Sequence, residues 1–391
     1  MVLADFRCRS MIDALSWMDD EQKERASRSL DRRVMIRDFG LVNFASNDYL
    51  GLANDPRVID AAKSAADQYG FGSGASPLVS GWTRSHQDLA DALVSYEQVE
   101  AVALFPSGFA ANLGTIAALV GKGDAVYLDR LNHACLIDGA KLSGASLRVF
   151  PHNDADRLEA ILARDQGRFR RSLVAVDGVF SMDGDLAPLD RISEICERFD
   201  AMLMVDEAHG TGVFGPNGRG ACEHFHVTDR VHVRVGTLSK ALGSLGGFVA
   251  GSRRLVDHLI NRSRTMIYST ALPSACCAAA NEAVKIAIAE PGRRERVHRV
   301  AIALRTSLQQ NGWKVIPSTG PIVPVWVGDP AAAVAISQNL RDQGLHVPAI
   351  RPPTVPEGTS RLRISLTASH SDEELARLVR ALGVAAPAKV R

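Results

Sequence analysis

Between about residues 100 and 250, short apolar segments alternate with longer amphipathic stretches. The predicted strands are Val102–Phe105, Ala125–Leu128, Ser146–Phe150, Ser172–Val176, Ala201–Val205, His232–Val235 and Gly247–Ala250. Stretches such as Gly108–Val120 and Leu189–Arg198 lie between them and are predicted helices. This alternation is typical of an α/β domain with a mostly parallel sheet. The strands are nearly continuous apolar runs, which indicates helices on both faces of the sheet.

The C-terminal part has a different pattern. Leu362–Thr367 alternates between apolar and polar residues and is predicted to form a half-buried strand. Ser371–Glu374 is a capping box in front of a helix whose apolar face comprises Leu375, Leu378, Val379 and Leu382. A strand followed by an amphipathic helix predicts a smaller α+β domain.

The chain has 391 residues, which is more than a single hydrophobic core usually serves. We therefore expect a large α/β domain over residues 51–285 and a small α+β domain over residues 286–391. Residues 1–50 are expected to pack with the small domain.

The charge balance excludes several function classes. Lys and Arg total 45 against 44 Asp and Glu, so no basic excess points to nucleic acid or to an anionic membrane surface. No apolar run approaches the length of a membrane span. Targeting peptides are poor in acidic residues. The N-terminus carries Asp5, Asp13, Asp19 and Asp20, so we do not expect it to be a targeting peptide. The six cysteines are scattered and are expected to be free thiols, so we expect a cytoplasmic protein without a bound metal.

Lys240 is the most informative residue. It lies in Val235–Gly243, just after an apolar run and before glycines, with hydroxyl residues on its N-terminal side. Asp206 and His209 follow a second apolar run. These groups match the needs of pyridoxal phosphate (PLP): a lysine amine for an imine, an aspartate that keeps the pyridine nitrogen protonated, and hydroxyls for the phosphate. The plain alternative for Asp206 is a helix cap.

Further polar motifs follow other predicted strands. Pro106–Asn112 leaves a strand and opens a helix, which suits a phosphate, and Gly108 permits close backbone approach. His133 follows Ala125–Leu128 and is placed to stack on the ring, and Ser181 ends another strand. Each motif alone could be an ordinary turn or a structural histidine. Together they lie at the carboxyl edge of the sheet, where open α/β folds bind ligands.

The glycine run Gly70–Gly74 has GxGxG spacing. No predicted strand leads into it, so a dinucleotide site is not indicated. We predict instead a tight loop that allows close backbone approach.

Several motifs in order resemble the α-oxoamine synthases, a family of fold-type I PLP enzymes. They are Asn43–Gly51, Gly72–Gly74, Ser107–Phe109, Asn132–His133, Asp183–Asp185, Asp206–Gly210, Thr237–Lys240, Ile350–Pro356 and Arg361–Ile364. The resemblance covers nearly the whole chain. It implies a PLP-dependent transferase with a mostly parallel central sheet in its large domain.

The resemblance also implies roles for individual residues. Lys240, His133 and Asp206 are expected to be catalytic. The expected cofactor-binding residues are Gly108, Phe109, His133, Ser181, Asp206, His209, Thr237, Lys240 and, contributed by a partner subunit, Thr270. The expected substrate-binding residues are Arg28, Asn47, His133, Thr354 and Arg363, with Arg25, Arg32 and Arg33 as alternatives to Arg28. A shared threonine implies a homodimer with shared active sites.

Within the family, Arg351–Pro356 resembles the branch that condenses L-alanine with a pimeloyl thioester in biotin biosynthesis, releasing CO2 and the free thiol. The thiol carrier is either CoA or an acyl-carrier protein. Another member, such as glycine C-acetyltransferase, stays an alternative, as do a PLP aminotransferase and a non-catalytic nucleotide-binding module. Pro77 and Trp82 depart from the usual pattern, which leaves the acyl-chain preference open.

Overall fold

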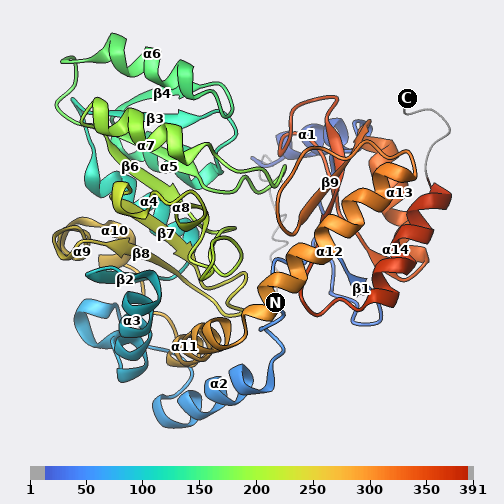
Figure 1. Cartoon of the computed structure of the whole chain (residues 1–391), viewed down its shortest axis with the longest axis horizontal. Helices are drawn as coiled ribbons and strands as arrows, with labels where there is room; N and C mark the ends of the chain where they lie inside the picture. The colour runs from blue at the N-terminus through green and yellow to red at the C-terminus, as the bar shows by residue number, and fades with distance from the viewer. Residues whose placement is uncertain (1–13, 386–391) are drawn as a thin grey trace, which may run out of the picture.

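The computed structural model describes residues 14–385. Figure 1 shows two bodies side by side, with the longest helix, α12 (Pro291–Gln310), on the side of the smaller one. Cys8, Asp5 and Asp13 lie outside the described residues. The other five cysteines are free thiols, as predicted. Within residues 14–385, no helix combines the length and the apolar character that crossing a bilayer requires.

The larger body is built on a seven-stranded sheet. In spatial order its strands are β2 (Ala101–Phe105), β8 (Gly247–Gly251), β7 (Val233–Thr237), β6 (Met202–Asp206), β5 (Ser172–Asp177), β3 (Ala125–Asp129) and β4 (Ser146–Phe150). Strand β8 runs antiparallel to β2 and β7 on either side of it, and the other neighbouring pairs in this sheet are parallel. The predicted fold class is therefore confirmed. All seven predicted strands are present, with ends shifted by at most two residues.

Helices cover both faces of this sheet. One face packs against α4 (Gly108–Leu119), α5 (Ala134–Ser143), α9 (Arg253–Arg262) and α10 (Arg264–Ile267). On the other face, the sheet shares a hydrophobic core with α3 (Arg84–Glu97), α6 (Ala155–Asp165), α7 (Leu189–Arg198), α8 (Ala221–His224) and α11 (Ser274–Ala289), and α2 (Pro56–Tyr69) packs on α11. Every residue of β2 and β3 is buried, which explains why these strands lack a polar face.

The smaller body contains a three-stranded antiparallel sheet in the order β11 (Ala349–Ile350), β12 (Ser360–Ser365), β9 (Ile322–Gly328). Helices α12, α13 (Pro330–Asp342) and α14 (Asp372–Ala385) pack with it. The capping box before α14 is present, because Ser371 and Glu374 bond each other's backbone N–H groups.

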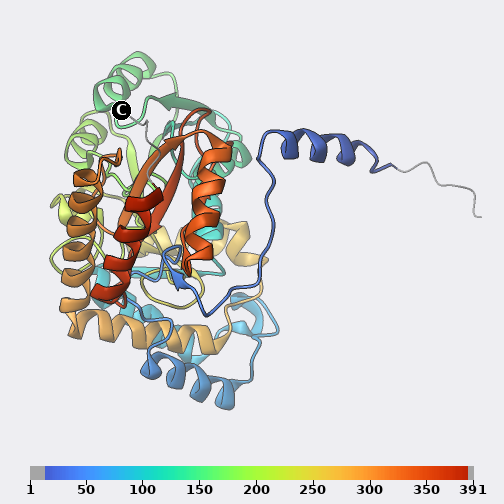
Figure 2. The same cartoon turned by 90° about the vertical axis from the view of Figure 1, so that its right-hand side faces the viewer.

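The N-terminal segment reaches the small domain through a short parallel pair, β1 (Val42–Asn43) with β10 (Leu345–His346). Phe44 is buried in the core of that domain. Before this point, α1 (Trp17–Ser27) buries no side chain and projects away from the body on an extended connection (Figure 2). The division at residues 50 and 285 stays a prediction.

One expectation about local structure is wrong. Strand β12 is buried along its whole length, because its polar side chains Arg361, Arg363 and Ser365 are covered at the junction with the large domain. The space around the glycine run is open, since a Cβ on Gly70, Gly72 or Gly74 would meet no atom of this chain within 4 Å, and the close backbone approach expected there stays a prediction. Gly70 and Gly74 supply a positive φ.

Candidate active site

The carboxyl ends of the central strands carry the polar residues singled out from the sequence. Asp177 ends β5, Asp206 ends β6 and Thr237 ends β7. The parallel register pairs Asp177 with Asp206 and Asp206 with Val235. Because parallel strands point the same way, their terminal side chains gather at one edge of the sheet.

Asp206 is 4% exposed and held on both oxygens. Its Oδ2 accepts a hydrogen bond from Asn112 Nδ2 at 2.7 Å, and its Oδ1 accepts one from the backbone N–H of Ala208 at 2.8 Å. A carboxylate has further lone pairs, so it can still accept from a ligand N–H group. Asn112 was not assigned a role from the sequence. The only signal was its place one turn after Gly108 on the helix that follows the phosphate turn.

Lys240 follows β7 and is half-buried. Burial lowers the pKa of its amine to about 8, and the positive charge of Arg363 acts in the same direction. The carboxylates of Asp206 and Asp177 oppose the change. With a pKa near 8, about one amine in ten is neutral at pH 7, compared with less than one in a thousand for an ordinary lysine. A neutral amine is the form that reacts with an aldehyde.

His133 caps the N-terminus of α5. Its backbone N–H donates to Asp177 Oδ2 at 2.8 Å, and its Nδ1 lies 2.9 Å from Cys135 Sγ. The ring stands edge-on to Phe109, with centroids 6.2 Å apart. His133 is solvent-exposed in the single chain, yet the surrounding protein atoms desolvate the imidazole and lower its pKa, as does Lys240. A neutral, exposed ring is suited to stacking on a ligand.

His209 is buried, and its Nδ1 lies 2.6 Å from the hydroxyl of Tyr49. Burial holds the pKa of His209 well below its ordinary value, with smaller contributions from Lys240 and Arg363. The imidazole is therefore neutral at physiological pH and serves as a hydrogen-bonding group. Tyr49 also donates to Asn47 Oδ1 at 3.1 Å, which connects the N-terminal segment to the site.

Arg363, on β12, is a buried cation beside Asn47. Its Nη1 and Nη2 donate to Asn47 Oδ1 at 3.1 and 3.2 Å, its Nη1 to Ser365 Oγ at 2.6 Å, and its Nε to the carbonyl of Ser181 at 2.6 Å. Within residues 14–385, no carboxylate forms an ion pair with it. A buried guanidinium without an anion is a strong site for a ligand carboxylate.

The turn between β2 and α4 has the features of a phosphate site. Ser107 caps α4 by accepting from the N–H of Ala110 at 3.1 Å, and the start of a helix carries N–H groups that the helix itself does not bond, which suit an anion. Thr237, which carries a hydroxyl group, packs against Gly108. A Cβ added to Gly108 would lie 3.3 Å from the Cβ of Thr237. Phe109 is 45% exposed on the same turn. Together with Asp206 and Lys240, these residues fit PLP.

Three predicted residues lie elsewhere in the single chain. Thr270 is exposed in the loop after α10. Arg28 pairs with Glu357, whereas Arg32 donates to the hydroxyl of Thr354 at 3.0 Å. Thr354 is exposed as well. Arg32 is thus the N-terminal arginine that contacts Thr354, and the assignment of an N-terminal arginine to the substrate stays a prediction.

The fold and this site define a class of enzymes, and the chain matches the model of aminotransferase class I and II over residues 40–382. The chain belongs to that family. It is 47% identical to 8-amino-7-oxononanoate synthase of Hahella chejuensis, over 90% of this chain and 88% of that protein.

Solved structures agree with this placement. The serine palmitoyltransferase of Sphingomonas wittichii is 33% identical, with a TM-score of 0.91, over 95% of this chain and 98% of that chain. A structure of serine palmitoyltransferase with PLP is 31% identical, with a TM-score of 0.90, over the same shares of the two chains. The predicted fold-type I architecture is confirmed by these likenesses.

Proposed function

We propose that this chain is a PLP-dependent acyltransferase that condenses L-alanine with a pimeloyl thioester to give 8-amino-7-oxononanoate, CO2 and the free thiol, a step of biotin biosynthesis. The observation that carries the reaction type is the buried, unpaired Arg363 beside a lysine whose pKa is about 8. The choice of substrates is supported by the relative named 8-amino-7-oxononanoate synthase at 47% identity.

PLP is the cofactor. Lys240 would bind it covalently, Asp206 would keep its ring nitrogen protonated, and the turn at Gly108 with Thr237 would hold its phosphate. His133 would lie against the ring, with Ser181 and His209 toward its phenolic oxygen. When bound, PLP supplies an electron-withdrawing ring that stabilises negative charge on the substrate Cα.

The protein's own side chains carry the remaining steps. Arg363 and Asn47 bind the carboxylate of L-alanine and hold its Cα–H bond toward Lys240. Lys240 removes that proton as a general base, a contribution worth about 10²–10⁴-fold in rate. His133 would supply a proton at the substrate during the loss of CO2; its imidazole is neutral at rest but exposed, so it would first take up that proton from solvent.

The site is completed by a second copy of the chain. Segments that contact the loop carrying Thr270 bear exposed apolar side chains, namely Phe71, Leu78, Val79, Leu245 and Tyr268. The loop is held by the N–H of Ala271, which donates to the carbonyl of Ala75 at 2.9 Å. Apolar patches of this kind mark association surfaces. We infer a homodimer in which Thr270 of one copy joins the phosphate site of the other, in the cytoplasm, where free thiols persist.

A substrate screen tests this function. Purified protein is supplied with alanine, glycine or serine, each with pimeloyl, acetyl or palmitoyl thioesters of CoA or of acyl-carrier protein, and thiol release is recorded. The proposal expects the highest kcat/KM for alanine with a pimeloyl thioester. Preference for glycine with acetyl-CoA would indicate glycine C-acetyltransferase, and pyruvate formed without a thioester would indicate an aminotransferase.

A further inference from the structure

His152 lies in the loop between β4 and α6, away from the residues assigned to cofactor or substrate. Its Nδ1 is 3.0 Å from Asp129 Oδ1, and its Nε2 is 2.8 Å from Asp185 Oδ2. The ring stands edge-on to Phe180, with centroids 4.4 Å apart. Burial disfavours the charged ring, but the hydrogen bonds to the two carboxylates outweigh it and raise the pKa of His152 to about 9. At neutral pH, the imidazolium donates to both carboxylates.

The first of these carboxylates belongs to the sheet. Asp129 is the last residue of β3 and is 2% exposed. Its oxygens also accept from the N–H groups of Leu131 at 2.8 Å and of Asn153 at 2.7 Å. It is therefore a fixed point at the edge of the sheet, in the turn that leads to His133.

The second carboxylate belongs to a small hairpin, residues 179–186, in which Val179 and Leu186 form an antiparallel bridge. Asp185 is its last residue but one, and its Oδ2 also accepts from Asn153 Nδ2 at 2.8 Å. The hairpin is closed by the Phe180 N–H, which donates to the Asp185 carbonyl at 2.9 Å. One attachment of the hairpin to the large domain therefore runs through Asp185, beside the bond from Asn153 Nδ2 to the Leu186 carbonyl at 3.2 Å.

The tip of this hairpin supports the buried guanidinium of the candidate site. The carbonyl of Ser181 accepts from Arg363 Nε at 2.6 Å, and Asp183 pairs with Arg361. Gly184 packs on β9, where an added Cβ would lie 2.8 Å from Ile322 Cβ. One short element thus joins the sheet edge to the strand that carries Arg363.

We propose that His152 is a positioning residue, which ties the 179–186 hairpin to Asp129 and thereby fixes Arg363 for the substrate carboxylate. It touches neither substrate nor cofactor and acts through Asp185 and the Ser181 carbonyl. The inference rests on the proposed function, because Arg363 is given its role there. A misplacement of about 1 Å in such a group can cost about 10²-fold in rate.

The first test compares His152→Gln with the unchanged holoenzyme. Glutamine keeps one donor but loses the charge and the second donor. We expect the KM for L-alanine to rise about tenfold, while kcat changes less than about threefold and the KM for the thioester is unchanged. Hydrogen exchange should accelerate in peptides that cover residues 179–186, and this readout needs no turnover. Unchanged KM and unchanged exchange would overturn the proposal.

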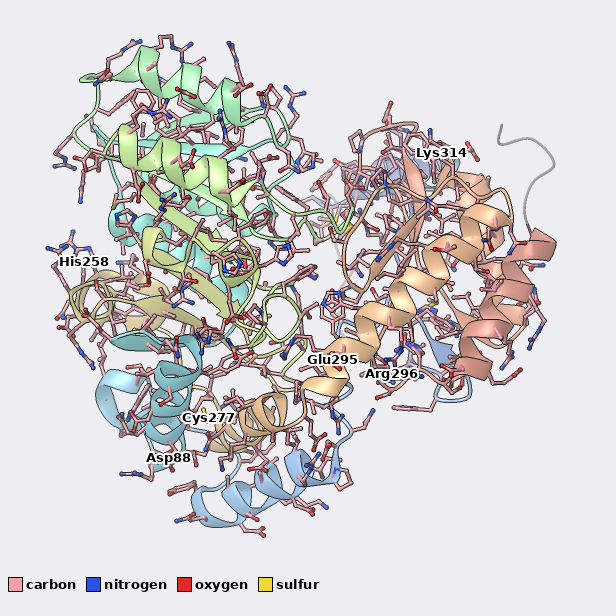
Figure 3. All side chains as sticks on the ribbon, in the orientation of Figure 1. Asp88, His258, Cys277, Glu295, Arg296 and Lys314 are labelled. Carbon is pink, nitrogen blue, oxygen red and sulfur yellow. The ribbon has the colours of Figure 1, made fainter. Side chains whose placement is uncertain are left out.

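Two further variants sharpen the test. Asp185→Asn should raise the KM for L-alanine similarly, and the double variant should be little worse than either single one, because both remove the same link. If the two substitutions raised the KM for L-alanine additively, His152 and Asp185 would not act through one shared contact. His258→Gln is the control: its Nε2 bonds the carbonyl of Ala118 at 2.9 Å, on the outer side of the large domain (Figure 3). It should behave as the unchanged enzyme.

The outcomes also separate this inference from the function it rests on. If the unchanged enzyme did not use L-alanine, the proposed function would fail at the substrate screen, while hydrogen exchange would still report whether His152 holds the hairpin. Loss of kcat with an unaltered KM would show that His152 does not act through Arg363.

Discussion

At the scale of single residues, the site depends on two basic groups with different surroundings, the half-buried Lys240 and the buried Arg363. Lys240 has Asp206 and Asp177 near it, and its pKa is nevertheless lowered because burial outweighs their attraction. Arg363 has no carboxylate partner among the described residues and bonds only neutral oxygens. Desolvation favours the neutral amine of Lys240. At Arg363, which stays charged, desolvation favours the binding of an anionic ligand.

Arg363→Lys tests the second group. A lysine cannot reproduce the planar set of donors that contacts Asn47, Ser365 and the Ser181 carbonyl. We expect the KM for L-alanine to rise by about tenfold or more, that is, by roughly 1.4 kcal/mol of binding, with cofactor content unchanged.

Arg296→Lys is the matched control. Arg296, labelled in Figure 3, bonds the carbonyls of Ala368 and His370 from α12 and serves the small domain alone. If both variants bound L-alanine as the unchanged enzyme does, Arg363 would not be the group that binds the carboxylate of L-alanine.

The pKa of Lys240 predicts a pH dependence in the cofactor-free protein. The folded value, about 8, lies below the ordinary value of 10.5, so the amine becomes neutral and nucleophilic at lower pH than an exposed lysine. Acylation of Lys240 by a small reagent should rise with pH and level off above about pH 8, as followed by peptide mass spectrometry. A reactivity of Lys240 that kept rising up to about pH 10 would contradict the prediction.

The same shift has a consequence for stability. Between about pH 8 and pH 10.5, the unfolded chain binds a proton on Lys240 that the folded chain does not. This residue's contribution to the free energy of unfolding therefore increases as pH rises through that window.

Lys240, Asp206 and His133 could be predicted because each directly follows a recognisable strand or begins the next helix. Asn112, Tyr49 and His152 were missed for the opposite reason. Their contacts to Asp206, His209 and Asp185 join segments far apart in the chain, so no local pattern records them. Thr270 was proposed only by resemblance, since the role proposed for it involves a second copy of the chain.

At the scale of elements, the 179–186 hairpin and β12 form one unit across two domains. The alternating pattern of β12 predicted a solvated face, but Arg361 and Arg363 on that strand bond the hairpin instead. A polar side chain facing a buried partner gives the same sequence pattern as one facing water. Periodicity therefore located the strand but could not tell which of its faces was covered.

Gly184→Ala tests this junction. Gly184 has φ +70°, and an added Cβ would lie 2.8 Å from Ile322 Cβ. We expect a loss of about 2 kcal/mol or more in the free energy of unfolding, from the left-handed backbone and the contact together, with a higher KM for L-alanine.

Gly358→Ala supplies the comparison, because Gly358 has φ +72° and open space around it. Gly358→Ala should lower the free energy of unfolding by only about 1–2 kcal/mol, the cost of the left-handed backbone, and should leave the KM for L-alanine unchanged. Denaturant unfolding measures both variants, and equal losses would show that the junction is not tightly packed.

At the scale of the whole molecule, the candidate site draws on both ends of the chain, and the proposed dimer would add a residue from a second copy. Asn47 comes from the N-terminal segment, Arg363 from the small domain and Lys240 from the large domain. The single chain leaves Thr270 exposed beside an apolar surface. The assembled enzyme is therefore expected to be a dimer with two composite sites.

Complementation tests that composite site. Lys240→Ala should be inactive, and Thr270→Ala should bind cofactor weakly and turn over slowly. In mixed dimers, one of the two sites combines an intact Lys240 with an intact Thr270, so activity should return to up to about a quarter of that of the unchanged enzyme after the two variants are unfolded and refolded together. Mixtures no more active than the sum of their parts would show that Thr270 acts within its own subunit.

The parallel pairing of Val42–Asn43 with Leu345–His346 sets an order for biosynthesis. As the ribosome releases the polypeptide, Phe44 emerges early, while most of its hydrophobic neighbours are encoded near the far end of the message. The large domain can fold during translation, but β1 can pair only after β10, near the C-terminal end, has been synthesised. A transcript truncated before codon 345 would thus yield a nascent product with an aromatic side chain left for chaperones to cover.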